Sequence, residues 1–171
     1  TSFMSWSYQD ARADDQWIYL PALRRVKRIS SDSKNQSFMG SDFTYDDLGE
    51  RHPDEDRHTL KGTETVNGDE CYVVESVPRD GSAGFSKTVS WIVKDQWVGL
   101  RREYYDAKGT VFKTLEIEEK EMVDGIWVIT NMMMTDRNRD HSTRIRMENV
   151  KFNNGLDEDF FTERQMRRGS R

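Results

Sequence analysis

The chain of 171 residues contains no long hydrophobic run and only one cysteine. No segment approaches the roughly 18 apolar residues that a membrane-spanning helix needs, which excludes a bundle of transmembrane helices. Because Cys71 is the single thiol, no disulfide can form within the chain. Hydrophobic residues make up 35% and charged residues 33%, so any core must be thin or one-sided. A sheet with one solvated face suits this composition better than a helical globule.

The charge balance is acidic, with 31 acidic and 26 basic residues and a net charge of -5. This argues against nucleic acid as a partner, because that binding depends on neutralising phosphates. The length predicts a single domain over 1–171, and the 11% of aromatic residues predicts a folded one. The first residues already alternate like a strand within a sheet, so we expect an N-terminal truncation that removed a targeting segment.

Alternation of apolar and polar residues with a period of two is the main pattern, and it is typical of half-buried strands. Turn sequences such as Asn67-Gly68 and Asp124-Gly125 separate the alternating segments and favour the positive φ angles of tight hairpins. Strands that follow one another through short turns predict an antiparallel meander of about eight to ten strands, which tends to curl or close. The predicted fold class is therefore mainly β.

Residues 30–57 interrupt this pattern with a polar, irregular segment that contains several apolar residues. Thr44 followed by Asp47 is a weak capping-box match, which predicts a short helix over 44–49. Long inserts with apolar anchors are usually functional loops, so we interpret 30–57 as a lid-like insert.

The C-terminal part loses its alternation from Asn153 onward. We expect Phe160 and Phe161 to dock on the fold and the basic tail over 164–171 to fray.

Motifs for catalysis and cofactors are weak. The segment from His52 to His58 offers two imidazoles and three carboxylates, but its spacing matches no metal signature and a solvated loop is the favoured interpretation. The sequence has no Gly-x-Ser-x-Gly motif and no Gly-rich phosphate loop. Cys71 fits a small buried strand residue better than a nucleophile. We therefore predict a protein that is not an enzyme, with no metal and no cofactor.

Two other features leave alternatives open. The basic segment from Leu23 to Ile29 can meet anionic lipid head groups or an acidic partner, or it can be a charged surface that resists edge pairing. In a strand, Met132 and Met134 share one face, where flexible thioethers suit either a cavity for an apolar ligand or an ordinary core.

The apolar faces of the predicted strands are rich in Trp, Tyr, Met and aliphatic side chains, whereas helices to cover them are scarce. If the sheet curls, its concave face is a hydrophobic trough that side chains or a ligand must fill. The residues that we expect to line this trough are Trp17, Tyr19, Trp91, Leu100, Tyr104, Leu115, Ile117, Trp127, Met132 and Met134.

The stretches 17–30 and 38–48 together resemble the outer-membrane lipoprotein-sorting protein family of Gram-negative bacteria, relatives of the periplasmic lipoprotein carrier and its outer-membrane receptor. The segment from Trp91 to Lys113 fits the same family more loosely. The resemblance implies a strongly curved antiparallel sheet forming an unclosed barrel, with a short helix or loop over its concave face. It also implies that 38–48 is the covering loop. The anchors of that loop would be Phe38, Met39, Phe43, Tyr45 and Leu48.

Family members bind the acyl chains of lipoproteins or other lipids in that cavity and move them across the periplasm. The resemblance thus implies a periplasmic or outer-membrane-associated lipid carrier without catalysis. The alternative is a non-transporting interaction module that docks a membrane transporter or another envelope protein through its basic strand and apolar face. A metal-dependent enzyme that uses His52, Asp54, Asp56 and His58 ranks last.

Overall fold

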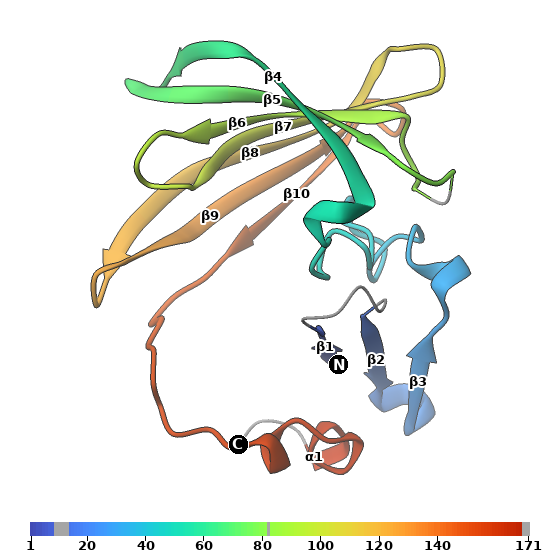
Figure 1. The fold of residues 1–171 in the computed structure, drawn as a ribbon. Helices are drawn as coiled ribbons and strands as arrows, with labels where there is room; N and C mark the ends of the chain where they lie inside the picture. The colour runs from blue at the N-terminus through green and yellow to red at the C-terminus, as the bar shows by residue number, and fades with distance from the viewer. Residues whose placement is uncertain (9–13, 82, 169–171) are drawn as a thin grey trace.

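The computed structural model describes residues 1–8, 14–81 and 83–168, and within them ten strands form two antiparallel sheets (Figure 1). The small sheet has the order β1-β2-β3, from strands β1 (Ser2–Trp6), β2 (Asp15–Leu20) and β3 (Arg25–Ile29). The large sheet has the order β10-β9-β8-β7-β6-β5-β4. Its strands are β4 (Asp56–Val66), β5 (Asp69–Pro78), β6 (Lys87–Val93), β7 (Gly99–Tyr105), β8 (Val111–Val123), β9 (Ile126–Asp136) and β10 (His141–Arg146).

Every neighbouring pair in the large sheet is consecutive in sequence, so the predicted meander is confirmed. Asn67 and Gly68 have φ values of 53° and 90°, and Asp124 and Gly125 have 50° and 81°, as expected of hairpin turns with two left-handed residues. Register shifts, such as the one between Leu60 and Gly62, are bulges that increase the twist of a sheet. The mainly β, antiparallel and unclosed architecture is as predicted, although the strands divide between two sheets.

The segment between β3 and β4 lies between the two sheets (Figure 1). It contains the 3-10 helices η2 (Ser31–Ser33) and η3 (Pro53–Glu55), while η1 (Pro21–Leu23) precedes β3. The capping contacts between Thr44 and Asp47 form, but turns rather than a helix occupy 44–49. The helix prediction is wrong: the capped turn does not continue as a helix, and the Asp47 carboxylate also bonds to Tyr104 and Lys113 of the large sheet.

The C-terminal segment leaves β10 and runs to the far side of the small sheet (Figure 1). It ends in the 3-10 helix η4 (Glu158–Phe160) and the helix α1 (Glu163–Arg168), which packs on β1, β2 and β3. Met166 of α1 is 6% exposed, so this part of the tail is docked rather than frayed; residues 169–171 lie outside the described residues. The docking prediction for Phe160 and Phe161 is wrong, since both remain over 39% exposed and pack edge-to-face on each other.

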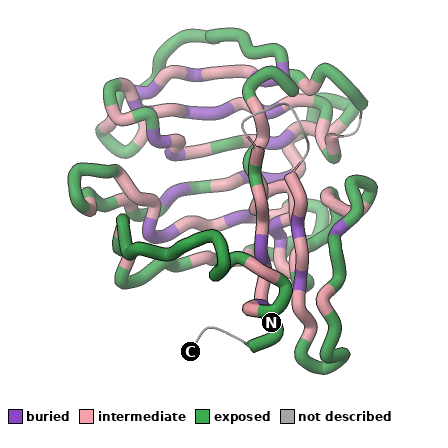
Figure 2. The backbone as a smooth tube through the Cα atoms, turned by 60° about the horizontal axis from the view of Figure 1, so that its bottom comes forward, coloured by how far each residue is buried: buried purple, intermediate pink, exposed green. Residues whose placement is uncertain are grey.

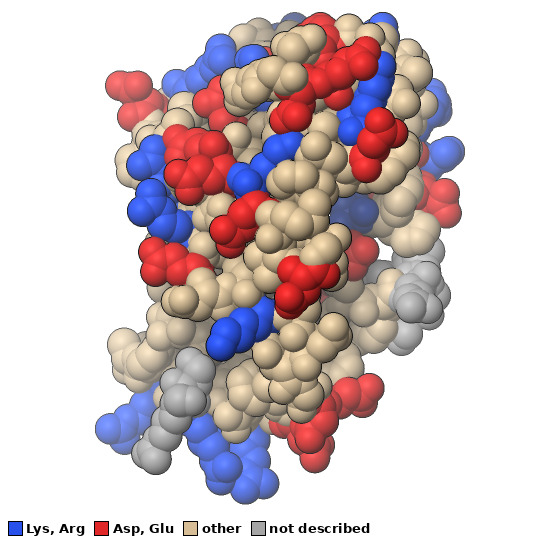
Figure 3. All heavy atoms as spheres, turned by 90° about the vertical axis from the view of Figure 1, so that its left-hand side faces the viewer, with Lys and Arg blue, Asp and Glu red and all other residues tan. Residues whose placement is uncertain are grey.

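Buried residues are spread along the strands of the large sheet, whereas the C-terminal segment is exposed nearly throughout (Figure 2). One core cluster includes Cys71, which is fully buried as predicted, and Trp91. A second joins Tyr104 and Met134 of the sheet to Phe43 of the inter-sheet segment. Figure 3 shows acidic and basic side chains interspersed over the upper part of one face. In the described part of the chain, no helix combines the length and the apolar character that crossing a membrane requires.

Candidate functional site

The strand register places a row of side chains on the face of the large sheet that the segment 30–57 covers. Ser76 pairs with Thr88, Thr88 with Tyr104, and Tyr104 with Lys113. Directly opposed residues of an antiparallel sheet project from the same face, so these four side chains form one line across β5, β6, β7 and β8.

A cavity of about 540 Å³ lies between this face and the residues 43–58, which is within the range of small-molecule sites. Its apolar lining residues include Phe43, Leu48, Phe85, Leu115, Met132, Met134 and Ile145. The polar part of the lining comes from strand residues such as His58, Ser76, Thr88 and Arg102, and from charged residues of the segment between the sheets, among them Asp47 and Arg51. The cavity is thus amphipathic rather than uniformly oily.

The structure brings four of the trough candidates together in this cavity. Those four residues are Tyr104, Leu115, Met132 and Met134. The candidates of the first core cluster, among them Trp91, are not in the lining of this cavity, although Leu115 and Met132 of the cavity wall pack against that cluster. Trp17 and Tyr19 belong to β2 of the small sheet.

The remaining candidates of the trough lie elsewhere. Leu100 and Ile117 pack in the first core cluster. Trp127 lies near the end of the β8–β9 hairpin, where the Lys120 ammonium sits 4.9 Å from its ring centroid.

The five predicted lid residues have different environments. Phe43 and Leu48 line the cavity, and Phe43 is only 2% exposed. Phe38 and Tyr45 turn toward the small sheet, with ring centroids 5.4 Å and 6.1 Å from that of Phe3. Met39 is 53% exposed. The segment therefore connects the two sheets through aromatic contacts on both sides.

A buried ion pair fixes the middle of this segment to the large sheet. Lys113 Nζ lies 2.7 Å from Asp47 Oδ2, and both side chains are less than 10% exposed. Tyr104 OH donates to Asp47 Oδ1 at 2.9 Å, and the Thr44 amide and hydroxyl donate to Oδ2. Burial and the neighbouring carboxylate raise the pKa of Tyr104 well above its usual range, so this hydroxyl stays a donor.

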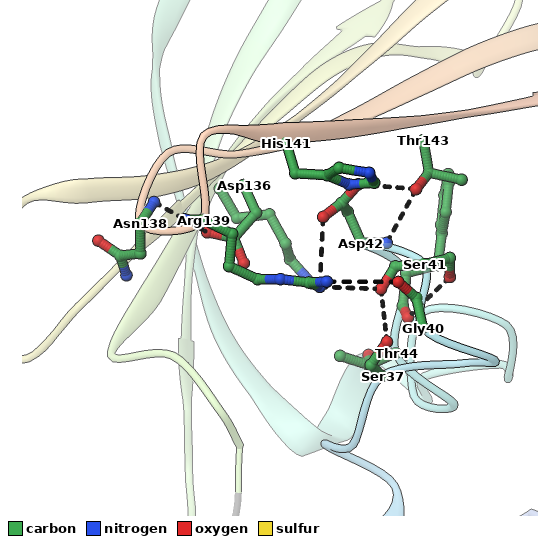
Figure 4. Close-up of polar contacts among 12 residues, drawn as sticks. Ser37, Gly40, Ser41, Asp42, Thr44, Asp136, Asn138, Arg139, His141 and Thr143 are labelled. Atoms are coloured by element: carbon green, nitrogen blue, oxygen red, sulfur yellow. Dashed lines mark hydrogen bonds and ion pairs between the residues drawn. The ribbon is translucent and has the colours of Figure 1, made fainter.

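A second anchor joins the same segment to β10 and the turn before it (Figure 4). The Asp42 side chain is fully buried, and its Oδ2 accepts from Thr143 Oγ1 and His141 Nδ1, each at 2.7 Å. Arg139 donates to the carbonyls of Gly40 and Ser41 and lies 3.4 Å from Asp42 Oδ1. Burial raises the pKa of Asp42, but these hydrogen bonds and the Arg139 charge outweigh it and leave the pKa below its ordinary value.

A third anchor closes the end of the segment where β4 begins. Arg51 donates from Nε and Nη2 to the two carboxylate oxygens of Asp56, at 3.0 Å and 2.8 Å. Such bidentate pairs are strong and geometrically specific. The Arg51 guanidinium also lies 5.6 Å from the ring centroid of Phe85, which lines the cavity.

Ser76 and His58 form a hydrogen-bonded pair in the cavity wall that the sequence reasoning missed. His58 Nε2 lies 2.9 Å from the Pro53 carbonyl, which only accepts, so Nε2 carries the proton and Nδ1 accepts from Ser76 Oγ at 2.8 Å. This is the pairing of a nucleophile with a base. However, β5 is flanked by β4 and β6, so the ladders engage the backbone N–H groups that an oxyanion would need. The pair suits binding of a polar group better than catalysis.

The proposed metal ligands do not converge. His52 Nδ1 accepts from the Asp54 amide, Asp56 pairs with Arg51, and His58 bonds to Ser76. Over the described residues, no group of three or more His, Cys, Asp or Glu side chains is placed to hold a metal ion.

Lys113 and Arg102 were not identified as functional residues from the sequence. The available signal was that each is a charged residue at a position of a strand where the alternation predicts an apolar one. Lys113 shares its strand face with Leu115, and Arg102 shares one with Tyr104. A charge on the covered face of a strand requires a partner or a ligand. By contrast, nothing in the local sequence pointed to Asp42.

Comparisons with known proteins agree with this arrangement. A LolA superfamily protein from Nitrosomonas europaea has a TM-score of 0.61 at 18% identity, covering 88% of this chain and 67% of that one, which shows that the chain has a LolA-like fold. A domain from Vibrio parahaemolyticus, described as an outer membrane lipoprotein-sorting protein domain, is 37% identical with a TM-score of 0.89. A DUF1329 family protein from Desulfovibrio piger is also 37% identical, with a TM-score of 0.87. Each of these two alignments covers 96% of this chain and 70% of the other.

The chain belongs to the family of these two proteins, which confirms the resemblance seen in the stretches 17–30 and 38–48. A family model described as an uncharacterized protein matches residues 1–168. No curated protein matches the chain.

Proposed function

We propose that this protein binds an acyl chain of a lipid or lipoprotein in the cavity beneath the large sheet and carries it within the periplasm of a Gram-negative bacterium. The observation that carries the proposal is the cavity of about 540 Å³ with its apolar wall. Met132 and Met134 suit such a ligand, because flexible thioethers adapt to chains of different shape. Each CH₂ group that leaves water contributes roughly 0.8 kcal/mol, so one chain supplies substantial affinity.

The test compares two neighbouring methionines on opposite faces of β9. Met132 lines the cavity, whereas Met133 points away from it and is also half-buried. We expect Met132→Trp to obstruct the apolar part of the cavity and strongly weaken uptake of the neutral dye Nile red, with Met133→Trp retaining it. Lipid extraction and mass spectrometry of the detergent-free protein should show acyl lipids in the wild type and in Met133→Trp only. Equal dye uptake by both variants, with both folded by circular dichroism, would contradict the proposal.

A non-transporting interaction module is the second candidate. Three polar anchors hold the segment 30–57 in place, and β3 presents Arg25 and Lys27 to solvent. Such a module would dock an envelope membrane transporter through this basic strand. It predicts that cross-linking in intact cells captures a partner, that Arg25→Glu with Lys27→Glu removes this capture, and that no lipid co-purifies.

A further inference from the structure

The polar and apolar lining residues occupy different strands of the cavity wall. On β4, β5 and β6 the wall consists of His58, Ser76 and Thr88. On β8 and β9 it consists of residues such as Leu115 and Met132. An amphiphile placed in this cavity therefore has one favourable orientation, with its chain under β8, β9 and β10 and its head near β4, β5 and β6.

Arg102 lies at the boundary between these two parts. On β7 it pairs with Ser90 on one side and Leu115 on the other, and its side chain lines the cavity while remaining accessible to solvent. Its Nε donates to Ser90 Oγ at 3.0 Å, which orients the guanidinium. Among the residues that the structure describes, no carboxylate lies within 4 Å of this guanidinium.

The other charged groups of the cavity wall are largely neutralised in pairs. Asp47 is held by Lys113 and Asp56 by Arg51. Arg102 has no such carboxylate partner, although its side chain also shares a hydrogen bond with that of Tyr104. A guanidinium without a carboxylate partner can offer its remaining N–H groups to the carboxylate or phosphate of a ligand, which its planar fork matches.

Two further carboxylates come from the loop side of the cavity. Asp46 Oδ2 lies 3.9 Å from Arg51 Nη1, and burial raises the pKa of Asp46. Glu50 is exposed, where water screens its charge. These carboxylates make the loop side of the cavity acidic, but the salt bridges of the wall pair Asp46, Asp47 and Asp56 with Arg51 or Lys113 and none of them with Arg102.

We propose that Arg102 is an anion-binding residue that holds the carboxylate or phosphate head of a single-chain amphiphile, with the chain in the apolar part of the cavity. The Ser76, Thr88 and His58 side chains provide polar contacts beside that head. This inference rests on the proposed function and assigns the chemical class of its ligand: anionic amphiphiles rather than neutral ones.

The test uses displacement of Nile red by dodecanoate, dodecyl phosphate, dodecanol and inorganic phosphate. The variants are Arg102→Gln and the neighbouring Arg101→Gln, whose guanidinium lies on the opposite face over Trp91 and pairs with Glu103. We expect Arg102→Gln to weaken both anionic amphiphiles about 10- to 100-fold, the loss of a hydrogen bond to a charged group, and to leave dodecanol unchanged. Arg101→Gln should change none of the affinities.

The outcomes separate this inference from the function on which it rests. If the wild type binds dodecanol and both anions, but Arg102→Gln alters none of them or all of them equally, the anion site is wrong and the lipid cavity stands. If inorganic phosphate binds as tightly as dodecyl phosphate, the site takes free anions rather than amphiphiles, and the inference is also overturned. If no amphiphile binds to the wild type, the proposed function fails with it.

Discussion

The segment 30–57 and the C-terminal segment 147–162 both connect the two sheets with little regular structure beyond short 3-10 helices, yet they are held in different ways. The first buries charged and aromatic side chains on the large sheet, with Asp42 and Phe43 nearly inaccessible to solvent. The second is exposed over most of its length. Outside strands and helices, and within the described chain, no backbone N–H between residues 148 and 156 donates to another backbone group.

This contrast indicates which of the two segments would move when a ligand enters the cavity. Aromatic anchors alone would let the segment 30–57 open as a lid at modest cost. Opening it would instead separate Asp47 from Lys113 and expose the buried groups around Asp42. Because the C-terminal segment has few such contacts, we infer that 147–162 is the part that moves more readily, while 30–57 acts as a fixed wall of the cavity.

The largest expected effect comes from removing the central anchor. Asp47→Asn leaves the Lys113 ammonium buried without its countercharge, which typically destabilises a protein by about 3–5 kcal/mol. We expect a loss of this size in the free energy of unfolding by urea. Asp159→Asn, in the exposed C-terminal segment, should change it by no more than about 0.5 kcal/mol.

A second variant distinguishes loss of the charge pair from loss of shape. Asp47→Asn combined with Lys113→Met removes the buried charge altogether, so it should recover part of the stability that Asp47→Asn loses. If Asp47→Asn costs no more than Asp159→Asn, the segment 30–57 is not held by this pair and the contrast with 147–162 disappears.

Local sequence determined much of the fold, because hairpin turns and strand alternation depend on residues close in the chain. Asn67-Gly68 and Asp124-Gly125 mark turns that the structure has at those positions. The site depended on contacts between distant residues. Asp47 meets a lysine 66 positions later, and Asp42 meets Thr143 across 101 positions. Such contacts follow from the register of all seven strands, which no local pattern specifies.

A smaller effect is expected at the Asp42 anchor, and it depends on pH. The folded-state pKa of Asp42 is lower than its ordinary value of 3.8. A depressed carboxyl pKa contributes stability above the unfolded-state value, and this contribution is lost as the pH falls through the folded-state pKa. We expect Asp42→Asn to lower the free energy of unfolding by about 1–3 kcal/mol at pH 7, the range for hydrogen bonds to a charged group.

The pH dependence is the sharper part of this prediction. Urea unfolding from pH 7 down to pH 3 should show the wild type and Asp42→Asn converging below about pH 4, where the carboxyl begins to gain a proton in the unfolded state. A constant difference across that range would mean that Asp42 acts through shape rather than charge. The anchor of 30–57 on β10 would then need another explanation.

The smallest expected effect lies in the C-terminal segment itself. Phe160 and Phe161 are 40% and 43% exposed and pack chiefly on each other, so replacing both by Ala should cost less than about 1 kcal/mol. Phe43→Ala removes the same side chain where it is 2% exposed, and we expect a loss of about 3 kcal/mol. Thermal and urea unfolding of the variants measure both. A cost above that of Phe43→Ala for the pair Phe160 and Phe161 would show that the C-terminal segment is held more firmly than 30–57, which would reverse the comparison.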